Sequence, residues 1–235
     1  MIILAVDTSG PCAGAAIMRD GEIISDVTAC HGLTHSQTSM PMIARALEEA
    51  GLGPADVDLF AAVTGPGSFT GVRIGVCEVK GLAHACGKPV VAVDALEALA
   101  MNGFGFDGVV CPILDARRGQ VYGAAFRFGG AMRPERLAPD QALSLEDYTA
   151  LLPADARCLF VGDGVSAHFD RANALLQGRG VKAPAPNRYL RAAAACELAR
   201  LDADKAMDPM RLEPTYLRAP QAERERAARL KAEEG

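Results

Sequence analysis

The chain has 235 residues, half of them hydrophobic, which excludes a wholly disordered protein. Lys and Arg number 24 and Asp and Glu number 29, so the net charge is −5. An acidic chain without Trp is a poor candidate for binding nucleic acid alone. No apolar run approaches the roughly 18 residues of a membrane span, and no signal peptide is evident, so we expect a cytoplasmic protein.

The first part of the chain predicts an α/β unit that opens with three strands. Apolar runs predict these strands at Met1–Val6, Ala13–Arg19 and Glu22–Thr28. Asp20-Gly21 is a two-residue hairpin signal, because both residues tolerate a positive φ. Helices and strands then alternate, with helices expected over residues 36–51, 68–87 and 94–102 and strands over 59–64 and 89–93.

A glycine-rich break at Gly103–Gly108 predicts a domain boundary. Beyond it we expect strands over 109–114, 120–128 and 158–161, helices over 145–152, 165–176 and 189–201, and a looser stretch over 129–140. The predicted organisation is an N-terminal domain (1–103), a second domain (104–186), a C-terminal helix and extended segment packing back on the core (187–220), and a charged tail (221–235).

The cysteines and histidines predict no metal site and no catalytic residue. Seven scattered cysteines without a CxxC pair indicate neither a disulfide framework nor a zinc cluster, and most stand among apolar residues, which predicts buried thiols. His31 and His35 are four residues apart, but Gly32 and Thr34 place them in a loop. No serine or cysteine stands in a nucleophile motif.

Two acidic loops of small residues follow strands, one in each half of the chain. They consist of Asp7, Thr8 and Ser9 in the first half and Gly162, Asp163 and Gly164 in the second. Such loops suit a cleft that holds phosphates and a cation, although each is equally typical of an ordinary turn. The segment from Gly65 to Gly71 joins a strand to a helix N-terminus, which attracts anions, but it lacks the lysine of a P-loop.

Gly67, Gly71 and Gly75 recur at a spacing of four in and before the second helix. A stripe of glycines leaves one helix face as bare backbone and permits close approach by another element. The approaching element can belong to the same domain or to a partner subunit, and the sequence leaves both open.

Taken in order, these segments resemble the bacterial TsaB (YeaZ) family over residues 1–218. The most specific are GPGSFTGVRIG at 65–75 and DARRGQVY at 115–122, with DTS at 7–9, GDG at 162–164 and PTYLR at 214–218 around them. The resemblance implies an α/β, actin-like (ASKHA, ribonuclease H-like) fold, in which two domains with mixed sheets surround a cleft.

The resemblance also implies a non-catalytic, activating subunit of the complex that makes threonylcarbamoyladenosine (t6A) on tRNA. Its partner TsaD carries the metal and transfers threonylcarbamoyl from its adenylate to the N6 of adenosine next to the anticodon, and TsaE supplies an ATPase. ATP and metal are then expected on those subunits and not on this chain. The catalytic relative has an HxxxH pair where this chain has His35 and Ser39. Contact with tRNA is expected only through the complex, and the isolated chain can form homodimers.

The family associates through two helices, which here gives a predicted interface of eight residues: Met40, Ile43, Leu47, Gly71, Val72, Gly75, Val76 and Val79. Glu78 stands in the second helix where the family usually has small residues. If Glu78 lies in the seam, the contact between the two helices, its carboxylate would require a cation beside it. Three alternatives stay open. They are an actin-like ATP-binding small-molecule kinase or ATPase that uses the two acidic loops, a metallopeptidase, and a homodimeric scaffold.

Overall fold

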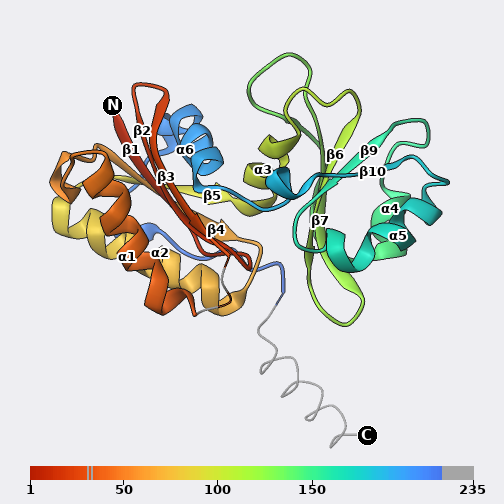
Figure 1. Ribbon diagram of the computed structural model, residues 1–235, viewed down its shortest axis with the longest axis horizontal. Helices are drawn as coiled ribbons and strands as arrows, with labels where there is room; N and C mark the ends of the chain where they lie inside the picture. Colours follow the sequence, from red (N-terminus) through yellow and green to blue (C-terminus); the bar gives the residue numbers. More distant parts are fainter. Residues whose placement is uncertain (31, 33, 219–235) are drawn as a thin grey trace, which may run out of the picture.

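Two five-stranded mixed sheets stand next to each other in the computed structural model, which describes residues 1–30, 32 and 34–218 (Figure 1). The first sheet contains β1 (Ile2–Asp7), β2 (Ala13–Arg19), β3 (Glu22–Ala29), β4 (Leu59–Gly65) and β5 (Val90–Asp94). The second contains β6 (Val109–Asp115), β7 (Gln120–Arg127), β8 (Glu135–Ser144), β9 (Cys158–Val161) and β10 (Gly180–Lys182).

Both sheets have the same topology. The strand orders are β3-β2-β1-β4-β5 and β8-β7-β6-β9-β10, so each sheet reads 3-2-1-4-5 when its strands are counted along the chain. In each, the first strand pairs antiparallel with the second and parallel with the fourth. The two halves are therefore topological repeats, and the expected α/β, actin-like fold with mixed sheets is confirmed.

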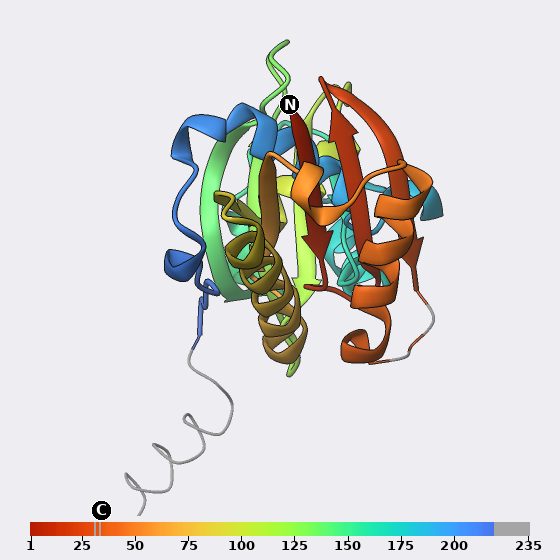
Figure 2. The same cartoon turned by 90° about the vertical axis from the view of Figure 1, so that its left-hand side faces the viewer.

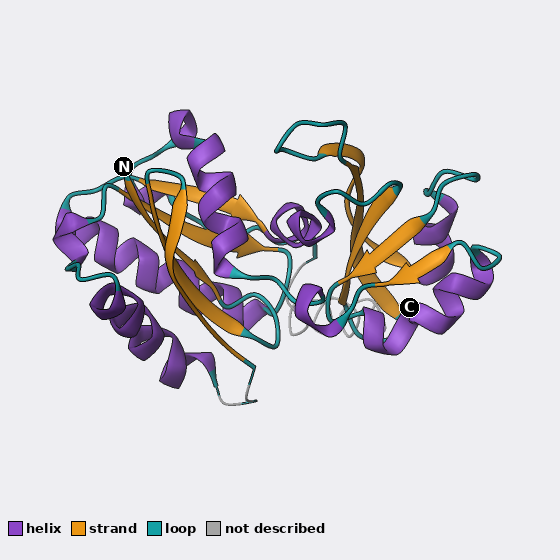
Figure 3. Cartoon of the chain, turned by 45° about the horizontal axis from the view of Figure 1, so that its top comes forward, coloured by secondary structure: helices purple, strands orange, loops and turns teal. Residues whose placement is uncertain are grey.

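Helices cover the faces of both sheets (Figures 1 and 3). They are α1 (His35–Glu49), α2 (Phe69–Cys86), α3 (Ala95–Ala100), α4 (Leu145–Ala150), α5 (Val165–Leu175) and α6 (Ala192–Leu201). Figure 2 shows α1 and α2 next to each other over the first sheet. Among the described residues, no helix is both long and apolar enough to cross a membrane.

Alternation along β1 explains why the first sheet is covered on both faces. Leu4 and Val6 pack into the cluster under α1 and α2, whereas Ile3 and Ala5 pack toward α3 and α6. Successive side chains of a strand point to opposite faces, so an unbroken apolar run is typical of a sheet buried on both sides.

One hydrophobic cluster continues from the first sheet into the second. It joins Ile3 of β1, Leu96 of α3, Val110 of β6 and Cys196 of α6. After α6 the chain returns to the first sheet, where Val90 and Met207 form an isolated antiparallel bridge. Helix α6 therefore packs on the first sheet, while Arg188 O accepts from Gly162 N and Arg218 lies 5.9 Å from the Tyr122 ring in the second half.

The predicted elements match the structure except near the edges of the second sheet. Asp20 and Gly21 form the expected hairpin turn with φ of 51° and 91°. The expectation of a loose stretch over 129–140 is wrong from Glu135 onward, where β8 begins. Strand β10 was not predicted at all. Both are edge strands that pair on one side only, and β8 carries Pro139 and mostly polar or exposed residues.

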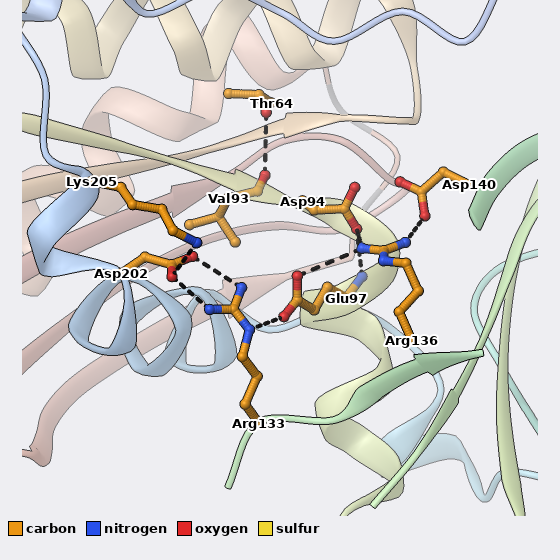
Figure 4. A network of polar contacts seen from close by, with 9 residues as sticks. All are labelled: Thr64, Val93, Asp94, Glu97, Arg133, Arg136, Asp140, Asp202 and Lys205. Atoms are coloured by element: carbon orange, nitrogen blue, oxygen red, sulfur yellow. Dashed lines mark hydrogen bonds and ion pairs between the residues drawn. The ribbon is translucent and has the colours of Figure 1, made fainter. Parts of the chain in front are cut away.

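A polar network joins β8 and the loop before it to α3 and to the end of α6 (Figure 4). Arg133 donates from Nε to Glu97 Oε1 at 2.7 Å and, through its two terminal nitrogens, to both oxygens of Asp202 at 2.5 and 3.0 Å. Arg136 pairs with Asp140 and lies 3.4 Å from Asp94. We call these residues the interdomain clamp: Asp94, Glu97, Arg133, Arg136, Asp140, Asp202 and Lys205.

The clamp makes stability depend on pH through Asp94. Burial, together with the neighbouring Asp140, raises the pKa of Asp94 to about 7. Between the unfolded and folded pKa values the folded state holds a proton that the unfolded state lacks, so stability falls as pH rises through this window. Between pH 5 and pH 8 the wild type should therefore lose free energy of unfolding. We expect this loss to be smaller in Asp94→Asn by on the order of 1 kcal/mol, measured by urea denaturation.

Asp208→Asn is the control for that measurement. Asp94 and Asp208 both cap a short helix, accepting from Glu97 N at 2.6 Å and from Met210 N at 2.7 Å, and an asparagine oxygen preserves this bond. Asp208 is exposed and lies outside the clamp. Equal pH profiles for the wild type and Asp94→Asn would contradict the prediction.

Candidate functional site

A cleft with a volume of about 600 Å³ opens between the two halves. Its walls come from four loops and the end of the described chain, namely residues 9–11, 66–70, 114–117, 163 and 215–218, with Tyr122. A narrow hollow behind it is lined by Asp7 and Gly162. The two acidic loops predicted to face each other across a cleft therefore do so.

The first acidic loop is held by its own hydrogen bonds and by α2. Asp7 is buried, and its Oδ1 accepts from Ser9 N at 2.8 Å and from Ser9 Oγ at 2.6 Å. Burial raises the pKa of Asp7. Thr8 Oγ1 donates to Gly71 O at 2.7 Å and accepts from Gly75 N at 3.1 Å. The Thr8 side chain therefore binds α2 and does not face the cleft.

The second acidic loop is a tight turn against β6. A Cβ on Gly162 would lie 2.1 Å from Ile113 O, and one on Gly164 would lie 3.0 Å from the same atom. Asp163 Oδ1 accepts from Asp115 N at 3.1 Å, and burial raises the pKa of Asp163. The two glycines have a packing role, and only Asp163 presents a functional group to the cleft.

Four backbone N–H groups at the cleft are already bonded inside the protein. Ser68 N donates to Ser9 O at 2.7 Å, and Ser9 N donates to Asp7. On the opposite wall, Asp115 N donates to Asp163 and Arg117 N to Asp115 Oδ1. Phosphate loops bind through free N–H groups, so these four N–H groups are not free to hold a phosphate as they stand.

The PTYLR segment packs on α2 at the mouth of the cleft. Thr215 N donates to Thr64 O at 2.8 Å, and the Tyr216 ring lies 5.0 Å from the Phe69 ring. Arg73 stacks 3.9 Å above Phe69 and donates to the Tyr216 hydroxyl at 2.7 Å. These contacts join the GPGSFTGVR segment to the PTYLR segment.

The predicted interface residues lie mostly inside the first domain. The side chains of Ile43, Leu47, Val72, Val76 and Val79 are buried in the core under α1 and α2. Gly71 and Gly75 face Thr8, because a Cβ on either would lie within 2.5 Å of it. The glycine stripe thus admits a loop of its own domain. Of the eight residues only Met40 is exposed, at 41%.

Glu78 faces α1 within the seam between the two helices. Ser39 Oγ lies 2.6 Å from Glu78 Oε1 and 2.7 Å from His35 O. One hydroxyl hydrogen cannot serve both acceptors, so a proton on Glu78 completes the arrangement. Burial raises the pKa of Glu78, which favours that proton. Among the described residues no ion-pair partner is found for Glu78. Glu78 therefore lies in the seam without the cation that we expected beside it.

Comparisons with known proteins decide the family. The chain is 38% identical over 225 residues to the tRNA threonylcarbamoyladenosine biosynthesis protein TsaB of Bacillus subtilis, covering 95% of this chain and 96% of that one. The chain belongs to the TsaB family. The TsaB of Haemophilus influenzae is 30% identical, with 93% and 94% of the two chains covered.

A solved structure and a family profile agree with membership of the TsaB family. YeaZ from Pseudomonas aeruginosa superimposes with a TM-score of 0.80 at 28% identity, covering 92% of this chain and 99% of that chain. The profile described as "TsaD: tRNA N6-adenosine threonylcarbamoyltransferase" matches residues 30–224. This chain is thus also similar to the TsaD group.

Where an HxxxH protein has two histidines, this TsaB-family chain has His35 and Ser39 at the start of α1. His35 Nε2 is 2.8 Å from Gly10 O, and Ser39 is buried against Glu78. Within the described residues no three His, Cys, Asp or Glu side chains gather as metal ligands. His31 and the predicted tail, 221–235, lie outside the described residues.

Cys12 and Cys30 form a disulfide, which the sequence did not predict. The expectation that the cysteines contain no disulfide is wrong for this pair, because the β2–β3 hairpin brings together two residues 18 apart. Cys111, Cys158 and Cys196 are buried thiols as expected, whereas Cys77 is exposed. The disulfide lies at the cleft end of the first sheet, next to Gly10 and Pro11.

Proposed function

We propose that this chain is a non-catalytic, activating subunit of the t6A synthesis machinery and that it pairs with TsaD. The observation that carries the proposal is its similarity, over nearly its whole length, to two bacterial TsaB proteins named for threonylcarbamoyladenosine biosynthesis. On this proposal TsaD transfers the threonylcarbamoyl group and TsaE supplies the ATPase. The complex works in the cytoplasm, and this chain meets tRNA only within it.

The cleft supports a role without catalysis by this chain. Backbone N–H groups of its walls donate to Ser9, Asp7 and Asp163 of the same chain. The Thr8 hydroxyl is bonded to α2. A chain of this kind needs neither ATP nor a metal of its own, and both belong to the partner subunits in this proposal. The acidic net charge of −5 also fits contact with tRNA through the complex only.

The partner is expected on the outward face of α1 and α2. The buried residues of the predicted interface support this face from beneath, while Met40 on α1 and Cys77 and Gly81 on α2 are exposed. A Cβ on Gly81 would meet nothing within 4 Å. A large side chain at this position therefore fits the isolated chain and obstructs only what approaches from outside.

Gly81→Arg tests the proposal directly. We expect co-expression of the wild-type chain with TsaD to give a stable heterodimer by size exclusion with light scattering. We expect Gly81→Arg to weaken it at least tenfold, because an arginine in the contact must be desolvated or push the helices apart. Gly75→Arg is unsuitable, since Thr8 of the same chain occupies the space beside Gly75.

Leu175→Arg is the matched control, because Leu175 is 43% exposed on α5 of the second domain. It should leave the heterodimer intact. If the heterodimer survives Gly81→Arg, the proposed function stands but the interface lies elsewhere on the chain. If no heterodimer forms with the wild type, the proposal fails. The alternative of an ATP-binding kinase or ATPase is then tested by titrating ATP against the isolated chain.

A further inference from the structure

The Cys12–Cys30 disulfide joins two segments that meet at the start of α1. Cys12 is the residue before β2, and Cys30 is the residue after β3. Ala13 and Ala29 form the last strand pair, so the two cysteines stand opposite each other one step beyond it, with Cα atoms 4.2 Å apart. The bond therefore closes the end of the β2–β3 ladder that lies at the cleft.

A second contact ties the same two regions together. His35 Nε2, in the first turn of α1, donates to Gly10 O at 2.8 Å. The N-cap residue Thr34 makes no side-chain capping bond, so α1 begins without the usual local anchor. The cleft loop is thus tied by the disulfide to Cys30, five residues before α1, and by a hydrogen bond to His35 at the start of α1, through loop positions two residues apart.

The two cysteines of the disulfide differ in exposure. Cys12 is 3% exposed, whereas Cys30 is exposed. Thiol–disulfide exchange starts when a thiolate attacks an accessible disulfide sulfur and expels the other sulfur as a thiolate. The exposed residue Cys30 is therefore the expected point of attack, with Cys12 as the leaving group.

We propose that Cys12–Cys30 is a reversible redox site that controls the anchoring of α1 and, through α1, the partner surface. The second part rests on the proposed function. A dithiol reductant attacks Sγ of Cys30, the S–S bond breaks, and Cys12 leaves as a thiolate that takes a proton from water. The second thiol of the reductant then attacks the mixed disulfide, releases Cys30 as a thiol and closes its own disulfide, so two electrons pass to the pair. A disulfide oxidant reverses both steps.

In a reducing cytosol, disulfides that form are mostly transient or redox-sensing, and a pair with one exposed cysteine fits that class. Reduction leaves the His35–Gly10 hydrogen bond to tie the cleft loop to the start of α1 without the covalent link at Cys30. The first turn then opens more often, and the seam residues Ser39 and Glu78 lose their fixed alignment.

Peptide mapping tests the bond itself. Trypsin cleaves after Arg19 and Arg45, which places Cys12 in residues 1–19 and Cys30 in residues 20–45. After native alkylation of free thiols and non-reducing digestion, these two peptides should be found joined, and dithiothreitol should separate them. Re-oxidation with oxidised glutathione should restore the joined species. Free, alkylated Cys12 and Cys30 in the air-oxidised protein would overturn the proposal.

Hydrogen exchange on the full chain tests the consequence without any partner. We expect reduction to increase exchange of the first amides of α1 that donate within the helix, from residue 38 onward, by about tenfold, with β4 unchanged. The double variant Cys12→Ser, Cys30→Ser should exchange like the reduced protein under both conditions, and Cys77→Ser should behave like the wild type. Equal exchange in the oxidised and reduced wild type would overturn the switch.

The link to the partner is tested by the affinity for TsaD in each redox state. A change of at least threefold, absent in the double serine variant, supports control of the partner surface. Equal affinities overturn that control. If TsaD binds in neither state, the proposed function fails, while the exchange measurement still decides the redox site.

Discussion

Gly71→Ala is expected to destabilise the chain by about 3 kcal/mol, the upper end of the usual cost of overpacking. A Cβ at this position would lie 2.1 Å from Thr8 O, 3.2 Å from Ser68 Cβ and 3.3 Å from the His35 ring. The nearest atom belongs to the backbone and cannot rotate away. The shift also disturbs the hydrogen bond from Thr8 Oγ1 to Gly71 O. Urea denaturation should show a lower midpoint with an unchanged slope.

Gly81→Ala in the same helix is the matched control. A Cβ there meets nothing within 4 Å, so only the helix propensity changes. Alanine is a better helix former than glycine by roughly 1 kcal/mol, and the variant should be more stable than the wild type. Opposite changes in stability for the same glycine-to-alanine substitution would distinguish the effect of packing from the effect of helix propensity. If both variants lose stability, the close approach of Thr8 to α2 is not the cause.

Periodicity in the sequence was enough to predict most of the fold. Strands β1, β4 and β6 are apolar runs, since both faces of each sheet are covered, and helices such as α2 end at a glycine with a positive φ. Strand β8 was missed because an edge strand has one partner and little burial, which leaves almost no pattern to read.

The disulfide could not be predicted because it depends on one irregular residue. A two-residue turn at Asp20-Gly21 pairs Met18 with Ile23, and regular pairing would then bring Cys12 opposite Ala29. A bulge between Ile17 and Met18 shifts the register by one residue and places Cys30 opposite Cys12 instead. A single extra residue in a strand leaves no clear mark in the sequence.

The candidate site was predicted in its position but not in its chemistry. The acidic loops do meet at the cleft, because each follows the first or fourth strand of a repeated sheet. What each side chain binds was not evident, because Thr8 is turned toward α2 by Gly71 and Gly75. The glycine stripe shows the same limit, since spacing indicates close approach but does not identify the approaching element.

Arg133→Met is expected to cost roughly 2 kcal/mol, because it leaves the carboxylates of Glu97 and Asp202 without their main cation (Figure 4). Both carboxylate side chains are 13% exposed or less, and Arg133 holds the pKa of Asp202 below its ordinary value. The expected cost is below the 3–5 kcal/mol of a fully buried pair, because Arg133 itself is 38% exposed. Methionine keeps most of the apolar stem, so the loss reports the charge contacts.

Arg200→Met is the control for the clamp. Arg200 is 37% exposed and also binds a carboxylate, but Glu197 lies on the same helix, so the pair joins no separate elements. We expect a loss of about 0.5 kcal/mol for this variant, as for exposed pairs within one helix. Since Arg133 connects the loop before β8 to α3 and α6, its loss should also widen the cleft, measured as a larger radius of gyration by small-angle scattering. Equal effects of the two variants would mean that the relative position of the two halves is set by the shared apolar cluster around Leu96 and Phe126 and not by the clamp.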